Sequence, residues 1–117
     1  MSVVFRQFAI EVHHKVYEWI KEGVEANTVA RKYKDYFIKN GFEKNYLYGP
    51  CHGTGIIEVE KPWIELNSNF TLDKNMTFMN DNHIFSTEFG LVWEDGFRVT
   101  KNGVEPFTDC YQKIIEI

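Results

Sequence analysis

The stretch HGTGIIEVEKPWI, residues 52–64, marks the point where the hydrophobic pattern of the chain changes from helical to extended. It opens with a histidine next to glycine and continues into GIIEVE, residues 55–60, which is short and rich in β-branched side chains. Segments of this kind are typical of strands when turn-forming residues bound them. We therefore expect a sheet to begin here and to fill the second half of the chain.

The segments that follow repeat the extended pattern. Three more candidate strands are MTFMND (76–81), FGLVWED (89–95) and FRVT (97–100). Runs of Asn, Asp, Ser and Gly mark turns between such segments, and they occur at 67–69, 73–75 and 101–103. The second half is therefore expected to be mostly antiparallel sheet.

The first half of the chain shows the three- and four-residue spacing of amphipathic helices. One apolar stripe consists of Phe5, Phe8, Ala9, Val12, Val16, Trp19 and Ile20. Gly23 is expected to end this helix. A second helix has a predicted buried face of Val29, Tyr33, Tyr36 and Phe37. Gly41 then supplies a left-handed cap position and Phe42 the hydrophobic contact behind it. The hairpin of helices and the sheet predict one α+β domain over residues 1–117.

Bulk composition narrows the classes of function. Ten phenylalanines in 117 residues supply enough apolar volume for a core, so disorder is not expected. The net charge of -4 and the interleaving of basic with acidic residues oppose a nucleic-acid partner, which needs a concentrated basic face. An apolar run near the ~18 residues that a membrane span requires is missing, and Arg6, Glu11 and Lys15 interrupt what would be the core of a secretory signal. A cytoplasmic protein is expected.

The two cysteines, Cys51 and Cys110, are too few for a disulfide framework and lack the spacing of a metal site. Both are expected to be reduced thiols. Cys51 adjoins His52, which raises the alternative of a nucleophile, but the sequence around it offers no orienting third group. We interpret Cys51 as a packing residue.

Residues able to bind a metal or transfer a proton fall in three separate stretches. His52 opens the first, Asp81 lies in the second and Glu94 in the third. Because side chains alternate between the faces of a strand, Glu94 and Asp95 cannot both point into one site. One imidazole and two carboxylates would suit Mn, Fe, Co or Zn, which accept mixed nitrogen and oxygen ligands. By spacing alone another interpretation stays open, because a histidine beside glycines is also typical of a turn and strand-end acids are commonly solvated.

The order of the stretches adds to this pattern. HGTGIIEVEKPWI, LDKNMTFMNDN and FGLVWEDGFRVTKNGVEPFT together resemble the catalytic C-terminal half of the pita-bread metallopeptidases, the family of methionine aminopeptidase, Xaa-Pro aminopeptidase, prolidase and creatinase. The resemblance covers nearly the whole chain. The positions that match the family pattern are His52, Gly53, Gly55, Glu60, Pro62, Leu72, Met76, Phe78, Phe89, Gly90, Glu94, Asp95, Val99, Thr100 and Gly103.

The resemblance implies half of a pita-bread fold, with a helical hairpin packed on a curved, mostly antiparallel sheet. It implies that His52 is the metal-binding histidine and Glu94 the last metal-bridging glutamate, while Asp81 stands where the family has its other glutamate. In the family a pair of metals activates the water that attacks the peptide carbonyl. The glycines around His52 would let the backbone approach the substrate closely.

Several positions depart from the family pattern. The family's two aspartate ligands precede the helical hairpin, in sequence that this chain does not contain. Val59 replaces the proton-transferring histidine, and Tyr48 replaces a second histidine of the Xaa-Pro branch. The Glu-Pro pair is Asp81-Asn82, and aspartate is one methylene shorter in a site whose ligand distances hold to a few tenths of an ångström.

The remaining histidines and tryptophans are expected to have structural roles. His83 lies near enough in sequence to compensate for the shortened carboxylate, but we expect a surface histidine. His13 and His14 are adjacent on the first helix, so they are not a ligand pair, and a solvated face is expected. Trp63 and Trp93 are expected in the core or at an interface, the alternative being a hydrophobic substrate pocket.

We therefore expect a shortened relative of the Xaa-Pro aminopeptidases and prolidases, without peptidase activity on its own. Its residual site, His52, Asp81 and Glu94, would bind a ligand, one weakly held divalent ion (Mn, Co, Zn or Fe), or nothing. One alternative is a working metallopeptidase half completed by another chain or by a missing N-terminal segment. Another is a protein-interaction module. The losses at Val59 and Tyr48 argue against the first alternative.

A homodimer is also expected. The pita-bread fold consists of two similar halves related by an approximate two-fold axis, and this sequence supplies one of them. The face that meets the missing half would be an apolar patch larger than a soluble monomer usually exposes. A second copy would cover it with a self-complementary interface. A peptide or small molecule is the other expected partner.

Overall fold

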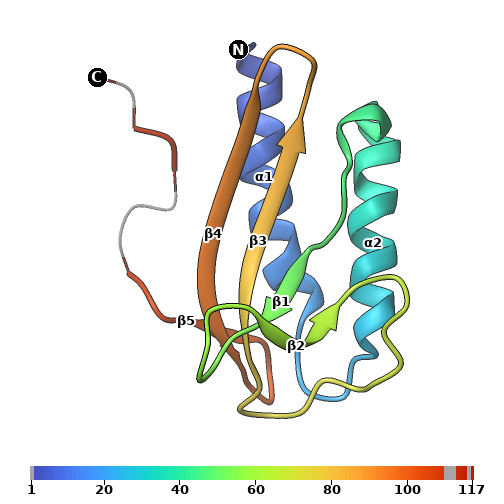
Figure 1. Ribbon diagram of the computed structural model, residues 1–117, viewed down its shortest axis with the longest axis vertical. Helices are drawn as coiled ribbons and strands as arrows, with labels where there is room; N and C mark the ends of the chain where they lie inside the picture. Colours follow the sequence, from blue (N-terminus) through green and yellow to red (C-terminus); the bar gives the residue numbers. More distant parts are fainter. Residues whose placement is uncertain (1, 110–112, 116) are drawn as a thin grey trace.

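Two helices cover one face of a five-stranded sheet in the computed structural model (Figure 1). The structure describes residues 2–109, 113–115 and 117. The elements are α1 (Val3–Trp19), α2 (Ala26–Lys39), a 3₁₀ turn (Glu43–Asn45), β1 (Cys51–Gly53), β2 (Glu60–Ile64), β3 (Thr77–Phe85), β4 (Gly90–Val99) and β5 (Val104–Pro106). The strand order is β2-β1-β3-β4-β5, and every neighbouring pair is antiparallel. The predicted α+β architecture is confirmed.

Helix α1 begins with a side-chain cap and buries the predicted stripe. The Ser2 hydroxyl accepts a hydrogen bond from the backbone N–H of Phe5 at 3.1 Å, which satisfies one of the free donors of the first turn. The helix ends at Trp19, and Gly23 lies in the turn that follows, with φ of 89°. One expectation was wrong: His13 is fully buried in the apolar stripe instead of lying on a solvated face.

Helix α2 ends in the way that the sequence predicts. Gly41 has φ of 80°, and the backbone N–H groups of Gly41 and Phe42 donate to the carbonyls of Ile38 at 3.1 Å and Phe37 at 2.8 Å. This pair of bonds is a Schellman motif. The Phe42 ring stacks on Phe8 of α1, with 4.2 Å between the ring centroids. The cap therefore also fixes the two helices against each other.

Three of the predicted strands differ in the structure. The GIIEVE segment is mostly a loop between β1 and β2, in which Ile56 is 99% exposed and the Glu60 carboxylate accepts the backbone N–H of Ile57 at 3.3 Å. An isolated β-branched run is not enough to make a strand when its side chains find nothing to pack against. The segments around 89–95 and 97–100 form one strand, β4, because Gly96 continues the ladder opposite Met79.

Strands β3 and β4 form a long hairpin that pairs residue for residue, from Thr77 opposite Arg98 to Phe85 opposite Gly90. At its turn, the Ser86 hydroxyl accepts the backbone N–H of Glu88 at 3.2 Å and of Phe89 at 3.1 Å. Figure 1 shows that this hairpin runs along α1. The uninterrupted register decides which side chains of the two strands share a face.

The core lies between the helices and the covered face of the sheet. Its largest fully buried apolar side chains are Tyr33, Phe37, Phe78, Phe97, Ile20, Ile64, Leu72 and Ile84. Tyr36, which the pattern placed in the buried face of α2, is only partly buried and stacks on Phe8 at 5.7 Å. None of the helices in the described part of the chain has the length and apolar character needed to cross a bilayer.

Replacing Phe37 with alanine should lower the free energy of unfolding by about 3–5 kcal/mol. The Phe37 ring is fully buried and meets Phe8 and Tyr33 edge to face, each at 4.9 Å between centroids, so its removal leaves a cavity. Ile38→Ala, at the next position but 44% exposed, is the matched control and should cost much less. Urea unfolding of both variants measures the difference. Equal losses would contradict the packing described for α2.

Candidate functional site

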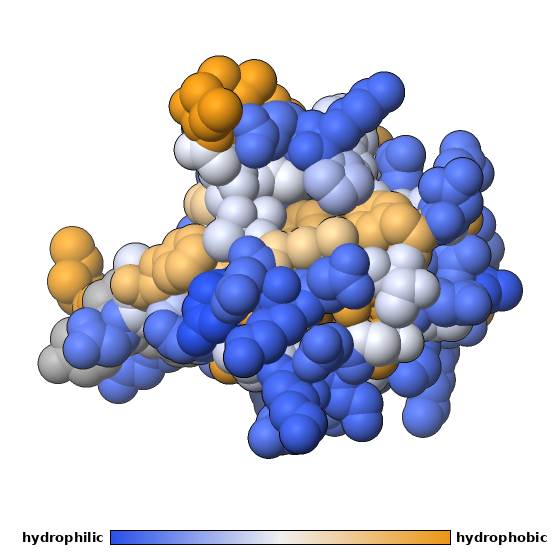
Figure 2. All heavy atoms as spheres, turned by 90° about the horizontal axis from the view of Figure 1, so that it is seen from below, coloured by the Kyte–Doolittle hydropathy of each residue, from blue (hydrophilic) through white to orange (hydrophobic). Residues whose placement is uncertain are grey.

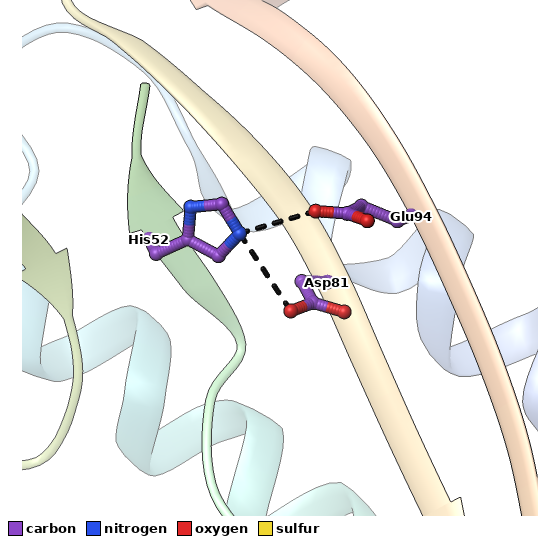
Figure 3. A group of neighbouring side chains, drawn as sticks. All are labelled: His52, Asp81 and Glu94. Atoms are coloured by element: carbon purple, nitrogen blue, oxygen red, sulfur yellow. Dashed lines mark hydrogen bonds and ion pairs between the residues drawn. The ribbon is translucent and has the colours of Figure 1, made fainter. Parts of the chain in front are cut away.

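His52, Asp81 and Glu94 converge on the face of the sheet that the helices leave open (Figure 3). They come from the three neighbouring strands β1, β3 and β4. His52 pairs with Met79 across β1 and β3, so Asp81 is the next residue of β3 on the same face, and Asp81 pairs directly with Glu94. One ligand atom from each side chain, a ring nitrogen of His52 and a carboxylate oxygen of Asp81 and of Glu94, can be chosen so that all three lie within 4.8 Å of one another. The structure thus brings together the three residues that the sequence singled out.

The two nitrogens of His52 both face hydrogen-bond acceptors. Nδ1 lies 3.0 Å from the carbonyl oxygen of Gly53, and Nε2 lies 3.1 Å from Glu94 Oε1 and 3.7 Å from Asp81 Oδ2. A carbonyl can only accept, so Nδ1 carries a proton, and a neutral imidazole has no second proton for Nε2. The arrangement therefore calls for a cation between Nε2 and the carboxylates. A proton or a metal ion would satisfy it.

The spacing of these atoms suits a metal ion. Ligands that bind a first-row ion at about 2.0–2.2 Å lie roughly 2.8–3.6 Å apart at octahedral or tetrahedral angles. The Nε2 to Oε1 distance of 3.1 Å falls in this range, and the 3.7 Å to Asp81 is slightly longer. A histidine ligand whose other nitrogen donates to a backbone carbonyl is also the usual outer-shell arrangement. The three residues fit a divalent cation.

A pocket of about 210 Å³ adjoins the three-residue cluster. His52, Asp81 and Glu65 are among its polar lining residues, while Tyr48, Val59 and Trp63 contribute apolar wall. Trp63 is 44% exposed and lines this pocket, so it does not lie in the core. Both positions where the family pattern has a further histidine, Tyr48 and Val59, border the same space. The pocket can therefore hold a small, largely apolar group beside the cluster.

Gly53 lies against the neighbouring strand β2. A Cβ at this position would lie 2.5 Å from the carbonyl oxygen of Glu60 and 2.8 Å from that of Pro62, both on β2. The glycine is thus required by the close approach of β2, which packs against β1 at an irregular register. It makes room for the neighbouring strand, and through that contact it fixes the backbone that carries His52.

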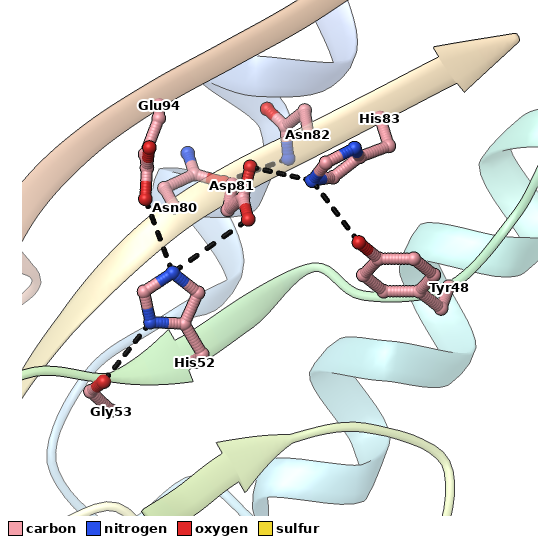
Figure 4. A network of polar contacts seen from close by, with 8 residues as sticks. All are labelled: Tyr48, His52, Gly53, Asn80, Asp81, Asn82, His83 and Glu94. Atoms are coloured by element: carbon pink, nitrogen blue, oxygen red, sulfur yellow. Dashed lines mark hydrogen bonds and ion pairs between the residues drawn. The ribbon is translucent and has the colours of Figure 1, made fainter. Parts of the chain in front are cut away.

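His83 contacts the cluster from the side (Figure 4). Its Nε2 lies 2.8 Å from Asp81 Oδ1 and 3.3 Å from the hydroxyl of Tyr48. Its side chain is only 16% exposed. His83 is therefore largely covered instead of being a solvated surface histidine, because side chains two apart on a strand share a face and Asp81 and Tyr48 lie against it there.

A second polar layer lies behind the cluster, between the hairpin and α1. His13 Nδ1–H donates to Asn82 Oδ1 at 2.8 Å, Asn82 Nδ2 donates to Asn80 Oδ1 at 2.9 Å, and Asn80 Nδ2 donates back to the His13 carbonyl at 3.0 Å. All three side chains are buried. The closed set of bonds satisfies amides that would otherwise be costly inside the protein. No local sequence pattern indicates this layer.

Asp95 belongs to this inner layer, as strand alternation predicts for the residue after Glu94. It accepts hydrogen bonds from Trp93 Nε1 and Thr108 Oγ1, each at 3.0 Å, and its Oδ2 lies 3.3 Å from His13 Nε2. The Trp93 ring stacks on His13 with 4.3 Å between centroids. Trp93 is thus a packing residue at the back of the site, as expected.

Burial shifts the pKa values of two other titratable side chains near the site, His13 and Cys51. It lowers the pKa of His13, and this effect outweighs the hydrogen bond to Asn82 and the attraction of Asp95, which both act to raise the pKa. Burial also raises the pKa of the Cys51 thiol well above its usual value, and the carboxylate of Asp81 adds to this shift. The interpretation of Cys51 as a packing residue is consistent with this burial. Cys110 lies outside the described residues.

Comparison with known proteins gives one family and a set of solved structures. The model of metallopeptidase family M24 matches residues 5–101. An X-Pro aminopeptidase from Thermotoga maritima MSB8 aligns with 92% of this chain at a TM-score of 0.85 and 19% identity. A prolidase from Pyrococcus horikoshii OT3 aligns with 95% at 0.87 and 21% identity. A methionine aminopeptidase from Rickettsia prowazekii aligns with 86% at 0.65 and 21% identity. No curated protein sequence matches the chain.

The chain spans 31%, 32% and 50% of these three solved chains, respectively. Likeness at this level of identity shows the fold. The described residues therefore form half of a pita-bread fold, as predicted, with greater likeness to the X-Pro aminopeptidase and the prolidase than to the methionine aminopeptidase.

The stability of the protein should fall as the pH drops below about 6.5, the ordinary pKa of histidine. Because burial lowers the pKa of folded His13, the unfolded chain binds a proton in a range where the folded protein does not, so stability rises with pH across that range. His13→Gln should show a shallower decline between pH 7.5 and 5.5, measured as the urea midpoint. His14→Gln, at the neighbouring and less buried position, should keep most of the slope. An unchanged slope in His13→Gln would refute this account.

Proposed function

The chain belongs to metallopeptidase family M24, and we propose that it binds one divalent metal ion through His52, Asp81 and Glu94. We further propose that it binds a small ligand in the adjoining pocket and does not hydrolyse peptides on its own. One observation carries the proposal. Both nitrogens of His52 face acceptors, and the second faces two carboxylates, so the cluster attracts a cation from outside the protein.

The donor set indicates which ions would bind. One imidazole nitrogen and two carboxylate oxygens suit Mn, Fe, Co or Zn, whereas Ca²⁺ and Mg²⁺ favour oxygen alone. Asp81 and Glu94 lie opposite each other on paired strands, so without a cation their like charges repel. The side chains of His52, Asp81 and Glu94 are 11%, 16% and 32% exposed, so an ion can enter from solvent. Three ligands with one at a longer distance support weak binding.

A bound ion would supply Lewis-acid chemistry at the mouth of the pocket. The protein residues beside it are poorly suited to complete hydrolysis. Val59 has no proton to give, and the hydroxyl of Tyr48 already contacts His83. Removal of a single oxyanion-stabilising donor typically lowers the rate about 100- to 1,000-fold. These residues support binding of a ligand and oppose turnover.

The pocket supports a small peptide end or a similar molecule as the ligand. Its apolar wall of Tyr48, Val59 and Trp63 would bury an aliphatic side chain or a proline ring. Two of its polar lining residues, His52 and Asp81, would hold an adjoining polar group directly or through the ion. The X-Pro aminopeptidase and prolidase that share this fold make such a peptide the first ligand class to test.

A homodimer is the second part of the proposal, and exposed hydrophobic side chains support it. The large hydrophobic side chains that are exposed between residues 56 and 66 are Ile56, Ile57, Val59, Trp63 and Leu66. Figure 2, a view from the end of the molecule where the loop between β1 and β2 lies, shows hydrophobic groups standing out on a largely hydrophilic surface. Closed two-fold dimers are the commonest way to cover such a surface.

Titration with Mn²⁺ or Co²⁺ should show one ion per chain, and Glu94→Gln should weaken binding at least about tenfold, because even outer-shell changes cost 10- to 100-fold in metal affinity. Glu88→Gln, an exposed change of the same chemistry on the turn between β3 and β4, is the matched control and should bind as the parent does. Calorimetry gives the affinity and stoichiometry. The same metal-loaded protein should show no turnover of Xaa-Pro dipeptides. Turnover that disappears in Glu94→Gln would replace this proposal with the enzyme alternative.

Light scattering at micromolar concentration should give twice the 13.8 kDa mass of one chain. The double substitution Ile56→Glu and Ile57→Glu should shift the protein to monomer, since it places charge in the apolar loop. Val4→Glu, at an exposed apolar position on α1, should leave the dimer intact. A monomer in the unsubstituted protein would exclude this interface, which must bury more than about 1,000 Å² to be stable.

A further inference from the structure

Asp81 has two oxygens that face different neighbours. Oδ2 lies 3.7 Å from His52 Nε2, toward the cluster, and Oδ1 lies 2.8 Å from His83 Nε2, away from it. Oδ1 is buried and has no hydrogen bond to any residue that the structure describes. A buried carboxylate oxygen left without a donor costs roughly 1–3 kcal/mol or more, so the nearby nitrogen is the group that would satisfy it.

The surroundings of His83 indicate which of its nitrogens carries the proton. Nδ1 is buried and has no hydrogen-bond partner among the described residues. A buried N–H without an acceptor is costly, whereas Nε2 faces Asp81 Oδ1 and the Tyr48 hydroxyl, which can both accept. We therefore assign the proton to Nε2, the nitrogen that lies beside these two oxygens.

Aromatic neighbours hold the His83 ring in place. Tyr48 lies 5.0 Å from it between ring centroids, and the Phe85 ring stacks on it at 6.0 Å. Figure 4 shows contacts in series from Tyr48 to His83, from His83 to Asp81 and from Asp81 to His52. The ring is thus a fixed contact for the carboxylate.

We propose that His83 is a positioning residue, which holds Asp81 Oδ1 so that Oδ2 points at the ion between His52 and Glu94. The inference rests on the proposed metal site. It explains how Asp81, which is one methylene shorter than the family's glutamate, can still be held in place as a metal ligand. Metal ligands must lie within about 0.2 Å of their ideal distance, and ligating carboxylates are themselves held by hydrogen bonds. A short carboxylate with one oxygen held has little freedom to turn away.

His83→Leu tests the inference by removing the contact to Oδ1. Mn²⁺ affinity should fall about 10- to 100-fold, as for other outer-shell changes. His83→Gln, whose amide N–H can occupy the place of Nε2–H, should restore most of the affinity. Urea midpoints show whether each variant is folded.

A double-mutant cycle separates positioning from a general structural effect. If His83 acts through Asp81, then His83→Leu should change affinity little in a protein that already carries Asp81→Asn. The same fold-loss in both backgrounds would overturn the inference.

Nitrogen NMR of the metal-free protein supplies a readout that needs neither metal nor a stable variant. His83 should be the Nε2–H tautomer, and an Nδ1–H tautomer would overturn the positioning role alone. Mn²⁺ uptake that His83→Leu leaves unchanged would do the same. Unsubstituted protein that takes up no Mn²⁺ would instead overturn the proposed metal site and the inference with it.

Discussion

The residue-for-residue pairing of β3 with β4 is the constraint on which the site depends. It sets Asp81 opposite Glu94 on the open face and Asn80 opposite Asp95 on the face that α1 covers. Because side chains alternate along a strand, a slip of one residue would bring the wrong side chains to each face. The buried contacts of His13 with Asn80 and Asn82 oppose such a slip, since only one register completes them. The inner layer therefore holds the outer one in place.

Each of the two polar layers of the hairpin places a histidine beside a carboxylate, and they differ in access to solvent. On the inner face, His13, Asn80 and Asn82 are joined by hydrogen bonds, while His13 Nε2 is buried without a hydrogen-bond partner among the described residues, 3.3 Å from Asp95 Oδ2. On the outer face, His52 Nε2 lies near two carboxylates, Glu94 and Asp81. His13 is fully buried beneath the hairpin, whereas the cluster around His52 adjoins a pocket and includes the partly exposed Glu94. A cation from solvent can therefore reach the outer layer more readily than the inner one.

Three positions at which this chain departs from the family pattern, Tyr48, Val59 and Asp81, line one pocket. Val59 and Tyr48 both line it, and they turn places that would carry imidazoles into apolar wall. Tyr48 also contacts His83, which in turn contacts Asp81. The changed positions Tyr48 and Val59 and the shortened carboxylate of Asp81 therefore line one pocket, although they lie far apart in the sequence.

The sequence by itself determined the features that depend on local order. The helical spacing, the Gly41 cap with Phe42 behind it, and the opposite faces of Glu94 and Asp95 follow from periodicity and backbone geometry, and the three motifs led to His52, Asp81 and Glu94. The burial of His13 beneath the hairpin and the loop at residues 55–59 depend on contacts between distant parts of the chain. The partners of His13 on β3, Asn80 and Asn82, are 67 and 69 residues away in the sequence. A histidine on a helix, or a β-branched run, looks the same in sequence whether or not a distant element packs against it, because burial is a property of the assembled fold.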